Sequence, residues 1–411
     1  MPISSPAPGR NPSCSPLKEA DADALIRREF AALATPYVDV AARGPLPASA
    51  KQAAEAILTA QLTGIVPKAE WLNLVETTRS LAAQLIGASA DEVAFTKNVS
   101  EGLNIVGAGL SLSPGDRIIV APSAEHPNNV FPWLWAAQER SVEVVAVSPG
   151  PNESLEQALI NRIDARTKLV AVTAVDFATG RRTDLEPIGT ACRTVGAFLL
   201  VDAAQSSGVL VQDMAKLPVD GWATAAQKGL LAPYGLGLLY VRRDWVDRIR
   251  PVALARFSVE VDADHEAAGA EDGWRLRDGA RRYEIGNYNY IGLAALRASL
   301  DLLLQIEPAN VERRSVAASE QLRSALSGLD IPMLPVSEGY RSHILAIAEH
   351  QGAGHDRSEV GWINALSAAL TRDGIAHSVR RGAVRLSTHM HLLPDSVTRI
   401  IDTIETWHRT R

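Results

Sequence analysis

The sequence predicts an α/β protein, with a large domain built on a mostly parallel sheet and a smaller α+β domain beside it. The chain has 411 residues, which is more than one small core requires. Between about residues 85 and 242, short runs rich in Val, Ile and Leu alternate with segments of helix-like spacing. Strands that are apolar on both faces and alternate with helices are typical of a parallel sheet covered on both sides.

The large domain is predicted from six apolar runs, which are EVAFT at 92–96, RIIVA at 117–121, VEVVAV at 142–147, KLVAVTAV at 168–175, AFLLVD at 197–202 and GLGLLYV at 235–241. Segments such as SLEQALINRI and LEPIGTACRTVG lie between them and have the spacing of helices. The polar stretch at 257–280 is predicted to be irregular. Two further helices, IGLAALRASLDLLLQI and the amphipathic SVTRIIDTIETW, belong to the C-terminal part.

These patterns divide the chain into three parts. Residues 1–20 begin with a run rich in Pro and Ser and are predicted to be a disordered tail. Residues 45–295 are predicted to form the large domain, and residues 21–44 to join residues 296–411 in the small domain. Ligands of parallel sheets bind beyond the carboxyl ends of the strands, so functional residues are expected in the loops at those ends.

Composition excludes several classes of protein. The formal net charge is −6 and no clustered basic face is visible, which argues against a nucleic-acid partner. The two cysteines, Cys14 and Cys192, form neither a disulfide framework nor a metal-ligand spacing, so no metal is expected. The longest apolar runs are strand-sized, and the first residues lack the apolar core of a signal peptide. The sequence therefore predicts a soluble cytoplasmic enzyme.

Lys228 is the one charged residue in the run WATAAQKGLLAPYGLGLLY, which covers residues 222–240. A lysine among apolar neighbours has its charged form disfavoured, so its pKa falls and the free amine becomes available. This is how a lysine is prepared to form a Schiff base. The alternative is a solvated lysine on a tight turn between two strands.

Three other strand-end loops carry groups that suit the same ligand. Asp202 ends a buried strand and could keep a pyridine nitrogen protonated, or cap the next helix. Gln205, one turn later, could donate to a phenolic oxygen. Ser100, in FTKNVSEGLNIV, opens a helix whose free N–H groups could hold a phosphate, although an ordinary cap is the alternative. His126, in APSAEHPNNVFPW, could stack on a pyridine or serve as a structural hydrogen-bonder. Together with Lys228 these loops indicate pyridoxal 5'-phosphate (PLP).

With these motifs in place, the chain resembles the class V aminotransferase superfamily of fold-type I PLP enzymes. That group includes cysteine desulfurases, kynureninases, isopenicillin N epimerases and C–S lyases. The matching runs are FTKNVSEGLN, EHPNNVFPW, VDAAQSSG, QKGLLAPYGLGLLYV, YEIGNYN and AVRLSTHMHLLPDSV. The resemblance implies PLP as cofactor, a seven-stranded type of sheet in the large domain at 45–295, an amino-acid substrate, and a homodimer whose active sites lie at the subunit interface.

The resemblance also implies a set of cofactor contacts, namely Val99, Ser100, His126, Asp202, Gln205, Gln227, Lys228 and Asn287. Within it, Lys228 would hold PLP covalently and move the proton at the substrate's α-carbon. Asn287, in the run GNYN, would reach the phosphate in the partner's site. Arg385 would grip the α-carboxylate through the two-pronged contact that a guanidinium makes well. Arg43 and Phe177 would lie beside the substrate side chain.

Four departures from the family pattern bear on the reaction. Gln227 stands where a His often precedes the lysine, and Ala225 replaces a serine that commonly contacts phosphate. Phe177 replaces an Asn of the desulfurases and adds an apolar wall. No cysteine follows Cys192, whereas a desulfurase needs a nucleophilic cysteine on a mobile loop after the lysine. On this basis we exclude a persulfide-forming cysteine desulfurase.

The sequence-based prediction of function is a C–S lyase that acts by β-elimination on an S-substituted L-cysteine in specialised metabolism. A decarboxylating or oxidative variant on the same class of substrate is included, because it uses the same carbanion chemistry. Epimerisation, as in isopenicillin N epimerase, and amino transfer are the competing reactions. A catalytically silent PLP-binding scaffold is the alternative from another class.

Overall fold

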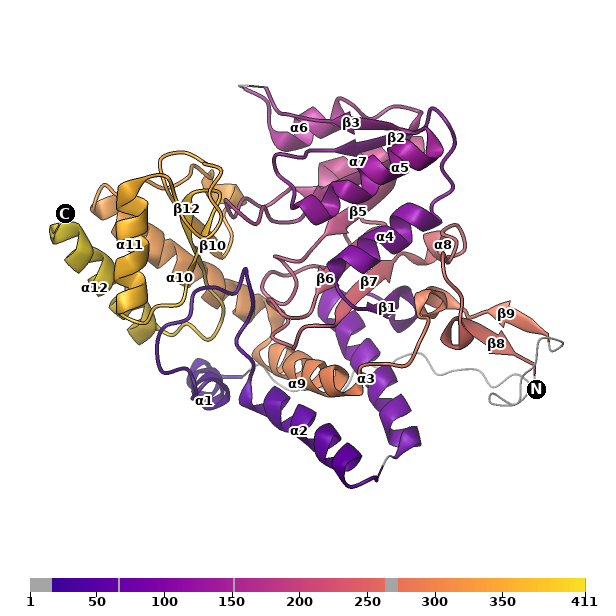
Figure 1. The fold of residues 1–411 in the computed structure, drawn as a ribbon, viewed down its shortest axis with the longest axis horizontal. Coiled ribbons are helices and arrows are strands. Elements are labelled where there is room, and N and C mark those ends of the chain that lie inside the picture. Colours follow the sequence, from indigo (N-terminus) through magenta and orange to yellow (C-terminus); the bar gives the residue numbers. More distant parts are fainter. Residues whose placement is uncertain (1–16, 66, 151, 263–272, 411) are drawn as a thin grey trace.

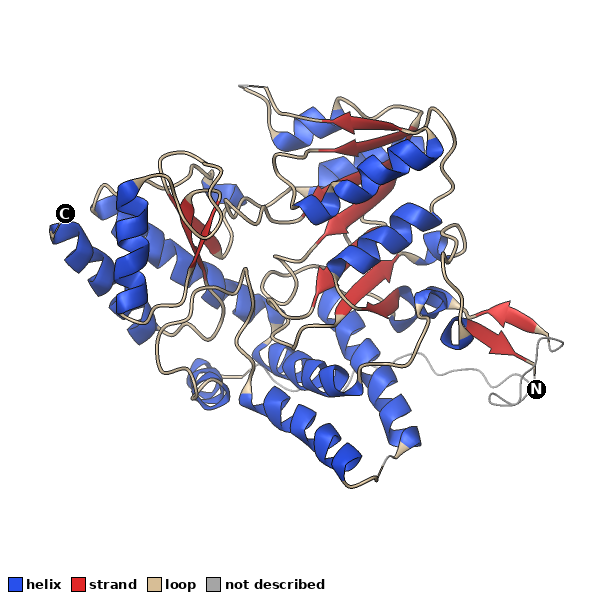
Figure 2. Cartoon of the chain, viewed as in Figure 1, coloured by secondary structure: helices blue, strands red, loops and turns tan. Residues whose placement is uncertain are grey.

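The computed structural model describes residues 17–65, 67–150, 152–262 and 273–410 (Figure 1). Its twelve named helices in this part are α1 (Glu19–Glu29), α2 (Ala48–Leu62), α3 (Lys68–Ile86), α4 (Val99–Gly109), α5 (Phe131–Arg140), α6 (Leu155–Ile160), α7 (Leu185–Val195), α8 (Arg243–Val246), α9 (Tyr290–Ile306), α10 (Pro308–Gly328), α11 (Gly361–Arg372) and α12 (Pro394–Arg409). The described residues form sheets of seven, three and two strands, and the helices pack against the two larger ones (Figure 2).

The central sheet of the larger unit has seven strands in the order β1-β7-β6-β5-β4-β2-β3. These strands are β1 (Val93–Thr96), β2 (Arg117–Val120), β3 (Glu143–Ala146), β4 (Thr167–Thr173), β5 (Phe198–Asp202), β6 (Gly221–Ala225) and β7 (Gly237–Val241). Strand β7 is antiparallel to both of its neighbours, and the other neighbouring pairs are parallel. The predicted α/β class and mostly parallel sheet of a fold-type I enzyme are confirmed.

The six predicted runs all contain strands, but β6 was not predicted. Three residues of its sequence, GWATA, are Gly or Ala, which are depleted in strands, and they outnumber the strand-favouring Trp222 and Thr224. Burial between β5 and β7 holds it in the sheet. Lys228 therefore follows a central strand, because β6 ends at Ala225.

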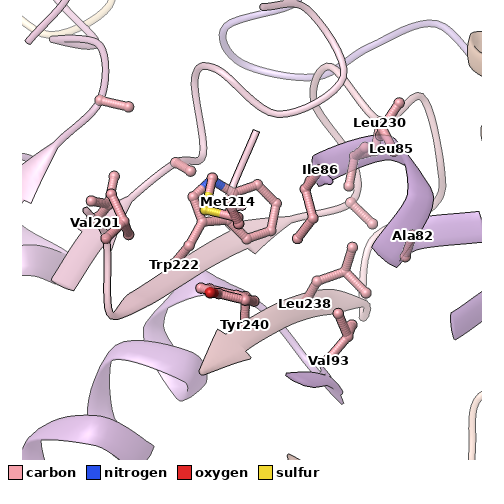
Figure 3. Close-up of a cluster of buried hydrophobic side chains, with 14 of the residues drawn as sticks. Ala82, Leu85, Ile86, Val93, Val201, Met214, Trp222, Leu230, Leu238 and Tyr240 are labelled. Carbon is pink, nitrogen blue, oxygen red and sulfur yellow. The ribbon is translucent and has the colours of Figure 1, made fainter. Parts of the chain in front are cut away.

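Alternate residues of each strand pack on opposite faces of this sheet, as the two-residue repeat of a strand requires. Along β5, Leu199 and Val201 face one apolar cluster while Phe198 and Leu200 face the other. Figure 3 shows part of the first cluster, where Trp222 and Tyr240 pack against side chains of α3. Helices α4 and α5 cover the second face. Both faces of the central strands are thus covered, while the edge strand β3 is partly exposed, and the strand ends are the places available for a ligand.

The smaller unit is an antiparallel sheet packed against helices. Its strands are β10 (Ile344–Ile347), β11 (Ser378–Arg380) and β12 (Ala383–Ser387), with β12 in the centre. They form a separate apolar cluster with α10, α11 and α12. The N-terminal segment joins this sheet through bridges from Tyr37 to Ala376 and from Asp39 to Ser387.

Two segments differ from the expectation. Helix α1 begins at Glu19, inside the stretch predicted as a tail over residues 1–20, and residues 1–16 lie outside the described part. The stretch at 257–280, predicted to be irregular, contains a hairpin of β8 (Val259–Val261) and β9 (Trp274–Leu276). In the described ranges, no helix is both long and apolar enough to cross a membrane.

Candidate active site

Lys228 lies on a tight turn between β6 and β7 that the N-terminal segment touches directly. The N–H of Gly44 donates to the carbonyl of Gln227 at 2.7 Å. A Cβ atom at Gly44 would lie 2.3 Å from the carbonyl oxygen of Lys228, so only glycine allows this approach. Leu231, whose N–H donates to the Lys228 carbonyl at 3.0 Å, has a φ of 55°. Backbone strain of this kind is kept only where the surroundings fix the chain, and it clusters at functional sites.

The electrostatic surroundings of Lys228 match the sequence-based reasoning. Burial lowers the pKa of its amine to about 8, while the charge of Asp202 partly opposes that shift. The guanidinium groups of Arg385 and Arg380 lower it further. About a tenth of the amine is consequently uncharged at pH 7, and the uncharged form is the one that forms a covalent bond to an aldehyde.

We therefore expect covalent capture of PLP by Lys228 to depend on pH in a characteristic way. With a pKa of about 8, the uncharged fraction of the amine rises from about 10% at pH 7 to about 90% at pH 9 and then levels off. An ordinary lysine, with a pKa of about 10.4, would instead gain about tenfold per pH unit across this range. The check is the rate of cofactor absorbance change after the protein freed of PLP is mixed with PLP at each pH. A rate that keeps rising tenfold per unit beyond pH 9 would contradict the lowered pKa.

Asp202 ends β5 and is buried. One carboxylate oxygen accepts the N–H of Ala204 at 2.9 Å. Burial raises the pKa of this carboxyl, with the Ala204 contact and the charge of Lys228 acting in the opposite direction. A buried carboxylate with so little compensation favours a cationic partner. The geometry suits the predicted role of pairing with a protonated pyridine.

Gln205 is also buried, and its amide makes one hydrogen bond to the N-terminal segment. Its Nε2 donates to the carbonyl of Ala41 at 3.0 Å. Its Oε1 is buried and has no hydrogen-bond partner in the described chain. The amide nitrogen carries a second N–H, so donation to a phenolic oxygen, as predicted, is compatible with the contact to Ala41. The unpartnered oxygen marks a place where a ligand or water with a donor would be stabilised.

His126 lies just before the short turn that follows β2, and its ring is neutral. Its Nδ1 accepts the N–H of Asn128 at 3.2 Å. Partial desolvation, and then the positive charges of Lys228, Arg381 and Arg385, lower the pKa of this ring to about 4. The ring meets Phe177 edge to face, with centroids 5.1 Å apart. A neutral ring near Lys228 suits the predicted stacking on a pyridine.

Arg385, in the central strand β12, is 2% exposed and is held from three sides. Its Nη1 donates to the carbonyl of Phe177 at 2.8 Å and its Nε to the hydroxyl of Ser378 at 3.2 Å. Its Nη2 lies 3.6 Å from Oδ1 of Asp39. Burial lowers its pKa to about 10 even though Asp39 opposes the shift. The guanidinium is thus preorganised by contacts from β11, the Phe177 loop and the N-terminal segment.

The predicted phosphate seat is the start of α4. Asn98 caps this helix by accepting the N–H of Glu101 at 2.9 Å, which leaves the N–H groups of Val99 and Ser100 without partners inside the helix. A Cβ at Gly237 would lie 2.8 Å from the carbonyl carbon of Asn98, so β7 packs directly on this turn. Such a helix start is a suitable anion site.

Three predicted residues are less directly placed. Asn287 is exposed, and in the described chain no contact joins its side chain to the other candidate residues. Gln227 contributes its backbone carbonyl to Gly44. Arg43 is exposed and lies beside Tyr37, whose hydroxyl donates to the Arg43 carbonyl at 2.8 Å.

Sequence reasoning missed several residues that shape the site. Asp39 and Ser378 hold Arg385, and Arg381 lies over the Phe177 ring at 4.9 Å. Glu125 is buried behind His126, where it accepts the N–H of Thr173 at 2.7 Å. Arg381 could have been found from the sequence. The run Arg-Arg-Gly directly precedes AVRLS, which contains the predicted substrate arginine, and a charged turn at this place indicates a strand end near the site. Asp39 had no such signal.

A family model described as aminotransferase class V matches residues 37–378. The chain belongs to the class V aminotransferase family. A relative described as a probable cysteine desulfurase, from Methanothermobacter thermautotrophicus, is 35% identical over 257 residues, and the match spans 62% of this chain and 62% of the relative. The class V fold is also seen in the apo structure of a cysteine desulfurase from Thermococcus onnurineus NA1. That structure has a TM-score of 0.79 and 24% identity, and the match covers 94% of this chain and 98% of the other.

A further structural neighbour is described as a complex of a cystine C–S lyase with its reaction product, cysteine persulfide. It has a TM-score of 0.80 and 23% identity over 91% of this chain and 98% of the neighbour. Sequence identities of 23–24% to these two structures establish the fold alone, and the activity of the chain depends on its own site residues.

The cofactor of this class V family member is pyridoxal 5'-phosphate, and the residues fit it. A half-buried lysine with a lowered pKa, a buried carboxylate with few partners and an open helix start are the groups that an aldehyde, a pyridine nitrogen and a phosphate require. The unpartnered Oε1 of Gln205 shows in addition that the polar groups here are not satisfied by the protein alone.

The predicted function is wrong. A C–S lyase for S-substituted cysteines, with persulfide formation excluded, conflicts with the relatives, which are described as cysteine desulfurases. The exclusion depended on the lack of a cysteine after Cys192. The physical reason for the error is that a persulfide need not form on a protein cysteine, since the neighbour described as a lyase has cysteine persulfide as its product. The epimerase and aminotransferase alternatives gain no support from these relatives.

Proposed function

We propose that the chain is a PLP-dependent lyase-type enzyme that removes the sulfur of L-cysteine and leaves L-alanine. The observation that carries the proposal is the placement of a lysine amine of lowered pKa beside a buried guanidinium in the class V fold. The 35% identity to a protein described as a probable cysteine desulfurase supports the choice of substrate.

Each residue of the site has a defined part in this proposal. Arg385 binds the α-carboxylate of L-cysteine, because its fixed fork of donors matches a carboxylate. Lys228 holds the cofactor and exchanges protons at the substrate's α-carbon, and Asp202 keeps the pyridine nitrogen protonated. The bound cofactor supplies an electron sink for the α-carbanion.

The remaining contacts position the ring. Val99 and Ser100 bind the phosphate at the start of α4, and His126 lies against the ring face. Gln205 donates its second amide N–H to the phenolic oxygen. Gln227 orients the lysine through the Gly44 contact, and Phe177 excludes water beside the substrate.

The sulfur acceptor in this proposal is a thiol from outside the described chain. Cys192 is buried in α7, and burial raises its pKa to about 12, so its thiolate is too scarce to accept sulfur. The overall reaction is L-cysteine plus a thiol, giving L-alanine and the persulfide of that thiol.

We further propose a homodimer in which Asn287 contacts the phosphate bound by the partner subunit. The support is the exposure of Asn287 together with apolar side chains left on the surface, which include Ile285, Phe131 and Trp135. A solution mass close to the 44.0 kDa of one chain would rule this out. The cytoplasmic location stays a prediction.

The test of the function is direct. PLP-loaded protein is incubated with L-cysteine and excess dithiothreitol, and L-alanine and sulfide are measured against time. We expect equal amounts of the two, because dithiothreitol releases sulfide from the persulfide. Formation of pyruvate and ammonia in place of alanine, or no consumption of L-cysteine, would overturn the proposal. L-Serine is the matched control substrate, since it lacks only the sulfur.

A further inference from the structure

A cavity of about 420 Å³ lies between the N-terminal segment and the small sheet, next to Arg385. Asp39 and Ser378 line it, and these two residues also contact the Arg385 guanidinium. The other lining side chains include Arg43, Tyr234, His377 and Arg380. One wall of the cavity is therefore formed by residues that contact Arg385, to which we assign the binding of the substrate carboxylate.

Most polar groups of the cavity are already partnered. Arg380 donates to Asp356 at 2.6 Å. His377 uses both ring nitrogens, one with the Ser367 hydroxyl at 2.8 Å and one with the Ile375 carbonyl at 2.9 Å. These residues form walls, and they leave few groups for a ligand.

Two lining groups of opposite charge, Arg43 and Asp39, have few hydrogen bonds of their own. Arg43 is exposed and forms no ion pair with any carboxylate of the described ranges, although Tyr37, Tyr234 and Asp39 lie near it. Asp39 also lines the cavity, and its carboxylate is only loosely held there: Oδ1 lies 3.6 Å from Nη2 of Arg385 and accepts no hydrogen bond from the described residues. A ligand that brings both a carboxylate and an ammonium group would satisfy both.

We propose that this cavity binds the sulfur acceptor, a small thiol that carries an α-amino acid group, with its carboxylate on Arg43 and its ammonium group on Asp39. The inference rests on the proposed function and adds the chemical class of the second substrate. The volume is ample, since a cavity of about 420 Å³ corresponds to about a dozen waters at about 30 Å³ each. Free cysteine and homocysteine are acceptors of this class.

The transfer is balanced. The Cβ–S bond of L-cysteine breaks and an S–S bond forms between the departing sulfur and the acceptor sulfur. Cβ gains the proton that the acceptor thiol gives up and is reduced by two electrons, while the two sulfurs are oxidised by one electron each. No other oxidant or reductant is needed, because the substrate sulfur and the acceptor sulfur together supply the two electrons that Cβ takes up.

The test is a competition among four thiols. L-Homocysteine carries both charged groups, 3-mercaptopropionate only the carboxylate, cysteamine only the ammonium group, and 2-mercaptoethanol neither. PLP-loaded protein receives a low concentration of isotope-labelled L-cysteine and equal amounts of the four. The reaction is stopped at early times with an alkylating reagent, and each labelled persulfide is quantified by mass spectrometry.

We expect the homocysteine persulfide to dominate in the native protein. In Arg43→Gln, the ratio of homocysteine persulfide to 2-mercaptoethanol persulfide should fall by about tenfold or more, since a charge-assisted contact is lost. The ratio for 3-mercaptopropionate should fall in parallel, while the ratio for cysteamine should not. Arg43→Lys keeps the charge and should recover part of the preference. Arg372→Gln, which alters an exposed arginine that pairs with Asp373 on the same unit, is the matched control and should leave all ratios unchanged.

The outcomes separate the two proposals. If alanine forms but Arg43→Gln leaves the ratios as in the native protein, the acceptor site is wrong and the proposed function stands. If no thiol gives alanine, both proposals fail. Because Arg43 is exposed, its variants should fold as the native protein does, and circular dichroism checks this.

Discussion

Replacing Lys228 by Ala should lower the rate of alanine formation from L-cysteine by at least about 10⁴-fold. Proton transfer by a positioned side chain contributes up to about 10⁴-fold by itself, and the variant also loses its covalent hold on the cofactor. The measurement is kcat for alanine formation with dithiothreitol as acceptor, made at saturating PLP so that weaker cofactor binding does not set the rate.

The control for this variant is Lys216→Ala. Lys216 is exposed and pairs with Asp213 at 2.8 Å, so its loss should change kcat by less than about twofold. Lys228→Ala should not destabilise the fold, because it removes an amine whose charged form burial disfavours. If Lys228→Ala retained the native turnover, Lys228 would not be catalytic, and the alternative hypothesis of a PLP-binding scaffold would be favoured.

The second large effect concerns stability. Arg79→Leu should lower the free energy of unfolding by about 3–5 kcal/mol, because it leaves a buried carboxylate without its charge partner. Arg79 in α3 is fully buried, and its guanidinium contacts Glu284 at 2.6 and 3.1 Å. Glu284 also accepts the N–H of Phe95 at 2.7 Å and the hydroxyl of Tyr288 at 2.6 Å. Denaturant unfolding followed by tryptophan fluorescence measures the change.

Two further variants give this prediction its contrast. Arg281→Leu removes a partly exposed pair with Glu76 and should cost about 0–1 kcal/mol. The double variant Arg79→Leu with Glu284→Leu removes both buried charges and should be more stable than Arg79→Leu alone. Equal stability of Arg79→Leu and Arg281→Leu would contradict the account. Since Glu284 lies three residues before Asn287, the Arg79 variant should also loosen the segment proposed to reach the partner subunit.

Features of the fold that depend on neighbouring residues could be predicted from the sequence, whereas features that depend on contacts between distant residues could not. Runs such as FLLVD predict their strands correctly, because a strand that is buried on both faces consists of apolar residues almost throughout. Lys228 and Asp202 could be singled out for the same local reason, as lone charges in apolar surroundings. Strand β6 was missed because Gly and Ala outnumber its strand-favouring Trp222 and Thr224, although pairing with β5 and β7 holds it in the sheet.

The contacts that complete the site could not be read locally. The pairing of Asp39 with Arg385 joins positions near opposite ends of the chain, and nothing in YVDVAARG announces it. The orientation of the Gln205 amide depends on the Ala41 carbonyl, which is equally remote in sequence. Asn287 needs a second subunit for its proposed role, so one chain does not define its surroundings.

Residues 38–44 contact both the strand that carries Arg385 and the turn that carries Lys228. This has a consequence for the order in which the protein folds during synthesis. The Val38 carbonyl accepts the N–H of Ser387 at 2.7 Å, the Ala41 N–H donates to the Ser387 hydroxyl at 2.8 Å, and Gly44 contacts the turn of Lys228. On a ribosome, the early segment must wait until almost the whole chain has emerged before these bonds can form. Until then the lysine turn lacks its cover, and the arginine that fixes the substrate has not been synthesised. The catalytic centre is therefore among the last parts of the molecule to be assembled, and an interrupted chain carries a reactive lysine without a site.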